Sequence, residues 1–188
     1  MSWPRLLAWI AVAALALLPV ACPPPRASGP APLLLLGPFA ELWAQVQWLR
    51  FQSASRRGEE ARALELAESA LALDPRASEG WQTLAAHLAF DLAAREREPV
   101  LARRRACFLA GLAVLQRGAE RSERPAELEL FRGLVLAAKA ESDPELDPGG
   151  APVLLLRAAE AFERAARLGD ERAAELAPQM RAEAARGE

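Results

Sequence analysis

The sequence predicts an all-α protein, made of antiparallel helical hairpins that follow an apolar N-terminal segment. Three observations lead to this prediction. The chain of 188 residues is rich in alanine, leucine, arginine and glutamate, which lose little side-chain freedom in a helix. From residue 33 onward the apolar residues recur with a helical period. Glycine and proline interrupt that period at short intervals, and β-branched residues are too few for an extended sheet.

Residues 1–22 indicate a signal peptide or a membrane anchor. Residues 6–22 carry no charge and follow Arg5. As a helix this run would span roughly 25 Å, slightly short of a hydrocarbon core of about 30 Å. It ends in Pro19-Val-Ala-Cys22, which resembles a bacterial lipobox with Cys22 as the lipidation candidate; Pro19 stands where that pattern prefers leucine. A lipoprotein and an uncleaved signal-anchor both place the bulk of the chain outside the cytoplasm. A cleaved, freely soluble product or a coincidental apolar leader would also fit this run.

Residues 23–37 are expected to form a linker between this segment and a helical domain over 38–188. Five of the ten residues 23–32 are proline, which removes amide donors and favours extended polyproline II geometry. The linker should therefore act as a semi-rigid spacer.

Seven helical segments are predicted beyond the linker, over residues 38–55, 59–73, 78–95, 99–118, 125–141, 151–168 and 170–185. Gly58, Pro75, Gly118, Gly169 and the stretch 144–152 mark breaks between them. The connections are short, so neighbouring segments should run antiparallel and form about three hairpins with a final capping helix. Pro178 is expected to kink that last helix or to end it early.

Small residues recur where two helices would have to approach closely. Asp74-Pro75 ends one such helix, and Trp81 begins the next large, large, small series. The residues of this pattern are Ala63, Ala67, Ala70, Trp81, Leu84, Ala85, Ala158, Phe162 and Ala165. The pattern resembles the tetratricopeptide repeat (TPR), a helix–turn–helix unit of about 34 residues, with Gly58 at its interhelix turn. The resemblance covers about residues 40–168 and implies a TPR-like solenoid that binds protein partners.

Few residues carry a pattern typical of chemistry. The net charge of −2 provides no positive potential for binding nucleic acid. No clustered metal ligands and no cofactor motif occur in the sequence. His87 has Thr83 and Asp91 one turn to either side, but no nucleophile accompanies it. We therefore expect it to form a surface or interhelix hydrogen bond. Cys107 lies in an apolar run and is expected to be a small buried hydrophobe.

Charged clusters are interpreted as solvated surfaces. The run 103–105 consists of three arginines and is expected to be a solvated helix start. The carboxylates before and within the segment 59–73 lie opposite an apolar face, as solvated carboxylates usually do. They are Glu59, Glu60, Glu65 and Glu68.

The first helix of the domain is the best candidate for an interaction surface, because its apolar side chains wrap more than one face. The surface candidates are Trp43, Trp48, Phe51 and, at a position that corresponds to the groove of the repeat family, Gln82. The sequence thus predicts a non-catalytic protein–protein interaction scaffold tethered to a bacterial membrane, with protein partners that it does not identify. A self-assembling structural lipoprotein of the envelope is the second hypothesis, and an enzyme is the third.

Overall fold

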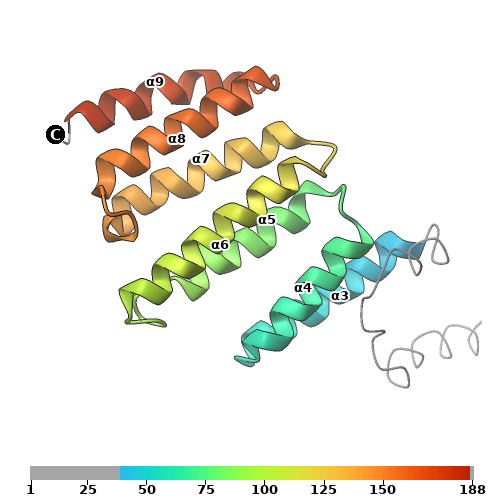
Figure 1. Cartoon of the computed structure of the whole chain (residues 1–188). Coiled ribbons are helices and arrows are strands. Elements are labelled where there is room, and N and C mark those ends of the chain that lie inside the picture. Colours follow the sequence, from blue (N-terminus) through green and yellow to red (C-terminus); the bar gives the residue numbers. More distant parts are fainter. Residues whose placement is uncertain (1–38, 187–188) are drawn as a thin grey trace, which may run out of the picture. The chain divides into compact units, whose positions relative to one another are not determined.

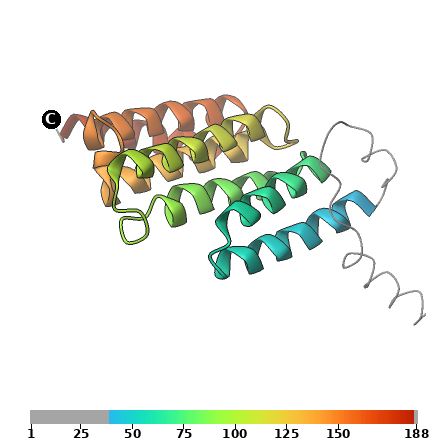
Figure 2. The same cartoon turned by 60° about the horizontal axis from the view of Figure 1, so that its bottom comes forward.

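The computed structural model describes residues 39–186, and over this range the protein is all-α (Figures 1 and 2). Helix α5 continues directly into a π-helix, η2, and a short 3-10 helix, η3, lies between α7 and α8. The elements are α3 Ala40–Arg56, α4 Glu60–Leu73, α5 Ser78–Ala86, η2 His87–Leu92, α6 Leu101–Ala119, α7 Pro125–Ser142, η3 Pro144–Leu146, α8 Gly150–Arg167 and α9 Glu171–Arg186. The predicted anchor over 1–22 with Cys22 and the linker over 23–37 lie outside the described residues.

Each of the seven predicted helical segments contains a helix, so the prediction of an all-α domain is confirmed. Successive helices run back and forth beside one another in both views. The most extensive contacts join α3 to α4, α7 to α8 and α8 to α9, while α5 and η2 together pack on α6. None of the helices within 39–186 is long and apolar enough to cross a membrane.

Two of the helices end in the same glycine turn. Gly58 after α3 and Gly169 after α8 have φ angles of +73° and +101°, in the left-handed region that glycine adopts at low cost. In the first turn, the amide of Glu59 donates to the carbonyl of Ala54 at 3.0 Å, and the amide of Gly58 donates to Ser55. Asp170 and Gly169 repeat both bonds after α8. These are Schellman motifs, and they confirm the chain reversal predicted at Gly58.

Small residues let the helices approach closely, as their spacing predicted. Ala63, Ala67 and Ala70 are fully buried along α4. On α7, Gly133 faces Phe162 of α8 so closely that an added Cβ would lie 2.4 Å from the ring. Gly118, in the last turn of α6, admits Trp81 in the same way. Phe162 and Trp81 therefore fill space that only glycine leaves open on the neighbouring helix.

Pro178 does not end α9, which continues to Arg186. The prediction that Pro178 ends the helix early was wrong, because the backbone around Pro178 is exposed to solvent. Proline removes an amide donor and leaves the carbonyl four residues earlier, that of Ala174, without its usual partner. Both Ala174 and Pro178 are exposed, so water can donate a hydrogen bond to that carbonyl while α9 stays packed on α8 through Ala173 and Ala177.

The arginine run at the start of α6 is not solvated throughout, which corrects a second prediction. Arg103 is exposed, but Arg104 is buried and its Nε lies 3.2 Å from Asp143 Oδ2. Arg95 also donates to Asp143, at 2.7 Å, and Arg105 donates to the backbone carbonyl of Glu145. These contacts tie the first turns of α6 and the segment before it to the residues that follow α7. Asp143, 39 residues away from Arg104, supplies the charge that makes burial of the guanidinium tolerable.

Candidate functional site

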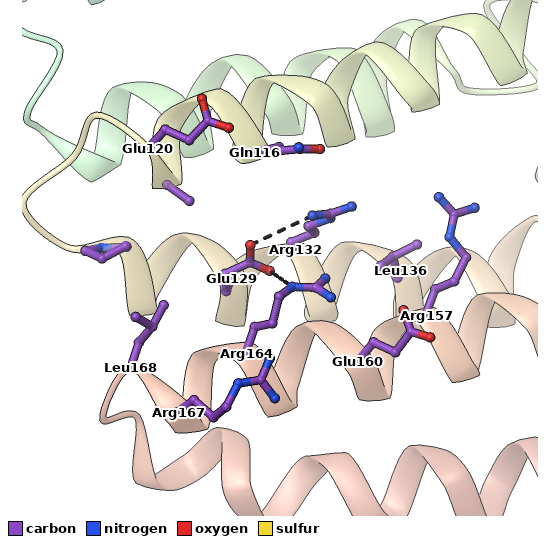
Figure 3. A pocket seen from close by; sticks show the side chains of 12 residues that line it. Gln116, Glu120, Glu129, Arg132, Leu136, Arg157, Glu160, Arg164, Arg167 and Leu168 are labelled. Atoms are coloured by element: carbon purple, nitrogen blue, oxygen red, sulfur yellow. Dashed lines mark hydrogen bonds and ion pairs between the residues drawn. The ribbon is translucent and has the colours of Figure 1, made fainter.

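A groove of about 720 Å³ crosses the C-terminal half of the domain. Helix α7 forms its floor, and side chains from α6 and α8 form its two walls (Figure 3). The lining contains both polar and apolar side chains: Gln116, Ala119, Glu120, Pro125, Glu129, Arg132, Leu136, Arg157, Glu160, Arg164, Arg167 and Leu168. The volume falls in the range of binding pockets in proteins, and four of the lining side chains are arginines.

One buried carboxylate at the floor serves two guanidinium groups. Glu129 accepts a hydrogen bond from Nε of Arg164 at 3.0 Å, and its other oxygen lies 3.8 Å from Nη1 of Arg132. Figure 3 shows both arginines converging on this carboxylate from α8 and α7. The longer separation is an ion pair without a hydrogen bond. Glu129 therefore satisfies Nε of Arg164 and leaves Arg132 with electrostatic attraction but no hydrogen bond.

Arg132 is the least satisfied polar group of the groove. Its side chain is only 18% exposed, and its buried Nε has no hydrogen-bond partner. Burial lowers the pKa of Arg132 below its ordinary value, and the charges of Arg164 and Arg157 lower it further. Arginine nevertheless stays protonated at neutral pH. A buried donor without an acceptor costs about 1–3 kcal/mol, so the floor of the groove holds a cation that lacks its acceptor.

The walls carry charges of both signs. Arg157 donates to Asp147 in the loop before α8 at 2.7 Å, so part of its charge is already balanced. Glu120 and Glu160, on opposite walls, form no ion pair with any residue in 39–186, and neither does Arg167. The groove thus offers arginine donors near its floor and carboxylate acceptors near its rim.

A second, smaller hollow of about 490 Å³ lies between α3 and α5, beside His87. His87 is buried, and each ring nitrogen faces a carboxylate: Asp91 Oδ2 at 2.8 Å from Nδ1 and Glu60 Oε2 at 3.1 Å from Nε2. Its ring meets Phe51 edge to face. The predicted interhelix hydrogen bond is therefore present and joins η2 to α4. Thr83 instead donates to the carbonyl of Glu79, so the row of three does not assemble.

Glu60 was expected to lie on a solvated face, and the structure corrects that. Besides its contact with His87, Glu60 forms an ion pair with Arg97 from the segment after η2. The same-helix pattern could not reveal this role because both partners come from later parts of the chain. Glu65 and Glu68 are exposed as predicted.

The four predicted surface residues occupy different environments. Phe51 is 4% exposed and belongs to the core, so it offers no surface to a partner. Trp48 is half-buried: it packs edge to face on Phe51 and lies against Gly80 of α5, where an added Cβ would approach its ring to 3.0 Å. Trp43 and Gln82 are half-buried as well. The aromatic side chains at 48 and 51 are internal because they fill the joint between α3 and α5.

The exposed apolar surface of α3 consists of other residues. Phe39, Leu42 and Leu49 are 62%, 58% and 65% exposed. With the half-buried Trp43 and Val46 they recur every three or four residues, so they form one stripe along the helix, which we call the α3 stripe. No described helix covers it.

Cys107 is half-buried rather than fully buried, although it packs against the core as predicted. Burial raises the pKa of its thiol, and the charge of Glu98 raises it further. A raised pKa lowers the fraction of reactive thiolate at neutral pH. Among residues 39–186, no group of three histidine, cysteine or carboxylate side chains is placed to hold a metal ion.

Sequence reasoning did not single out the charged residues of the groove. A signal was present: Arg157, Glu160, Arg164 and Arg167 recur every three or four residues, and therefore share one face of α8. Such a face is usually solvated, and only the position of α7 beside it turns the row into the wall of a groove.

Comparison of the chain with protein-family models, with curated protein sequences and with solved structures gave no significant match.

Proposed function

We propose that this protein is a non-catalytic, TPR-like interaction scaffold, tethered by its N-terminal segment to a bacterial membrane and holding protein partners outside the cytoplasm. The uncharged run 6–22 with Cys22 at its end supports the tether. The small residues of α4 and the glycine turn at Gly58 support the repeat relationship, since the alanines at the spacing that resembles the repeat family are fully buried and the turn closes where that spacing expects it.

The α3 stripe is the observation that carries the interaction function. Single exposed leucines are ordinary on any protein, but here three large apolar side chains, each more than half exposed, follow one another on one helix face. We propose that the stripe receives an amphipathic helix of a partner protein, which would bury its own apolar face against Leu42 and Leu49.

The test is photo-cross-linking in the native membrane, with a cross-linker placed next to the stripe at Gln45, followed by mass spectrometry. Leu42→Glu together with Leu49→Glu should abolish a recurrent partner, because two charges would then have to be desolvated at the contact. Leu109→Glu on α6 is the matched control: Leu109 is 50% exposed and lies outside the stripe. It should leave capture unchanged.

The outcomes separate this proposal from the self-assembling structural protein. Capture of another copy of the chain alone, together with concentration-dependent oligomers that the two glutamates dissolve, would support the structural envelope protein instead. A partner retained equally by the Leu42→Glu/Leu49→Glu and Leu109→Glu proteins would refute the α3 stripe as the binding face.

A further inference from the structure

We propose that the groove formed by α6, α7 and α8 is a second binding site, which takes an acidic, extended peptide segment of a partner protein. One carboxylate side chain of that segment would be held by Arg132 and Arg164. This inference rests on the proposed scaffold function and assigns it a ligand class.

The floor of the groove has more donors than acceptors. The side chain of Arg132 makes no hydrogen bond to any residue within 39–186; its Nε is buried, so a ligand would bind its terminal nitrogens. Arg164 uses Nε for Glu129, and its two terminal nitrogens make no hydrogen bond within the same range. Guanidinium groups match a planar carboxylate in shape as well as charge, so an incoming carboxylate supplies the acceptors that Glu129 alone does not.

The rim favours a peptide over a continuous polyanion. Glu120 and Glu160 project from opposite walls and would repel the evenly spaced phosphates of a nucleic acid. The same carboxylates can accept hydrogen bonds from a peptide backbone, and the amide of Gln116 can accept or donate them. Leu136 and Leu168 offer apolar contact to intervening side chains. An isolated carboxylate flanked by peptide amides therefore fits this pattern of charge.

Glu129 competes with the ligand inside the protein. It already occupies one side of the two guanidinium groups, at 3.0 Å from Arg164. Its replacement by glutamine keeps the shape and removes the charge, which leaves both arginines more attractive to an external carboxylate. Replacement of Arg132 removes one of the two guanidinium groups that would hold the ligand and should weaken its binding. It also removes a buried donor that has no acceptor.

The experiment selects random seven-residue peptides displayed on phage against the full chain in detergent micelles. The selected peptides are then synthesised with a fluorophore and their binding is measured by fluorescence anisotropy. We expect enrichment of aspartate or glutamate at one position among uncharged residues, and Arg132→Gln should weaken binding about tenfold or more with an unchanged or higher Tm. Glu129→Gln should tighten it. Arg103→Gln, an exposed arginine of α6 outside the groove, is the control and should change nothing.

Several outcomes would overturn the inference. They are selection without acidic enrichment, equal binding by the Arg132→Gln and Arg103→Gln proteins, displacement of the peptide by a poly(dT) oligonucleotide at lower concentration than by unlabelled peptide, and loss of binding that merely follows a lower Tm. If partner capture still requires Leu42 and Leu49 while the groove binds no acidic peptide, the groove inference fails and the scaffold proposal stands.

Discussion

Gly133 and Phe162 show how far single residues determine the packing of this domain. Phe162 is almost fully buried, and its ring occupies the space that a side chain at position 133 would need. A glycine within a helix lowers helix stability by roughly 1 kcal/mol relative to alanine. Here that loss is offset by a large aromatic side chain at the contact between α7 and α8.

Gly133→Ala should therefore destabilise the protein, although alanine is the better helix former. An added Cβ 2.4 Å from Phe162 forces the ring or the helix to move. We expect a loss of about 1–3 kcal/mol in the free energy of unfolding, measured by urea denaturation. Phe162→Leu should cost less in the Gly133→Ala background than in the wild-type protein, because the smaller side chain relieves the overlap. Additive effects of the two substitutions would contradict this account.

At the scale of the elements, α9 is held by packing more than by helix propensity. Its buried face consists of alanines, Ala173, Ala177 and Ala184, and its N-terminus is capped by Asp170, whose Oδ1 accepts a hydrogen bond from the amide of Ala173 at 3.0 Å. Pro178 interrupts the hydrogen bonds of the exposed face. The helix forms in spite of it because α8 supplies a continuous surface to pack on.

Pro178→Ala should raise the free energy of unfolding by about 1–3 kcal/mol, since it restores one amide donor and removes the clash of the proline ring. Thermal unfolding followed by circular dichroism measures the gain as a higher Tm. Gln179→Ala is the matched control at the adjacent exposed position and should change Tm little. An equal or smaller gain for Pro178→Ala than for Gln179→Ala would show that α9 tolerates the proline without strain.

The sequence predicted the helices well because the signals for helices are local. The apolar period and the glycine and proline breaks lie within each segment, so each bound could be placed to within a few residues. The π-helix η2 was not predicted: nothing in His87–Leu92 distinguishes it from a continued α-helix. Arg104 and Glu60 were assigned to solvated faces because their partners, Asp143 and Arg97, come from distant segments.

The groove could not be predicted from the sequence for the same reason, because its residues come from separate segments of the chain. Glu129 and Arg132 are three residues apart and could be seen as a pair on one helix, but such pairs are common on solvated faces. The approach of Arg164 from α8 and the burial of the Arg132 side chain depend on how three helices pack. On α3, periodicity indicated an apolar helix but not which apolar face meets α5, so it did not separate Phe51, which is buried, from Leu42 and Leu49, which are exposed.

At the scale of the whole molecule, the α3 stripe and the groove formed by α6, α7 and α8 belong to different helices. Substitutions can therefore be made in one without altering the residues of the other. The stripe is built on α3, and the groove on α6, α7 and α8. If the two proposed sites bind one partner, their different chemistry, one apolar and one ionic, would give specificity because the partner would have to satisfy both. Salt should weaken contact at the groove and leave the stripe largely unaffected.

The tether is tested on the full chain in its native membrane. For a lipoprotein, Cys22→Ser should block processing or release the protein from the membrane fraction, since acylation at that residue would supply the anchor. Fractionation and immunoblotting for size and location measure both effects, with Cys107→Ser as the control for loss of a thiol. Unchanged size and unchanged membrane retention in the Cys22→Ser protein would instead support an uncleaved signal-anchor.

The glycine turns at Gly58 and Gly169 are closed by main-chain hydrogen bonds and use no side chain from elsewhere in the protein. Such a turn depends only on its own residues and on the end of the helix before it. A helix that ends in such a turn, as α3 and α8 do, would keep its own chain reversal if its coding sequence were duplicated. An added helix of this kind would need new contacts only along its faces, where alanine and leucine can be exchanged one at a time.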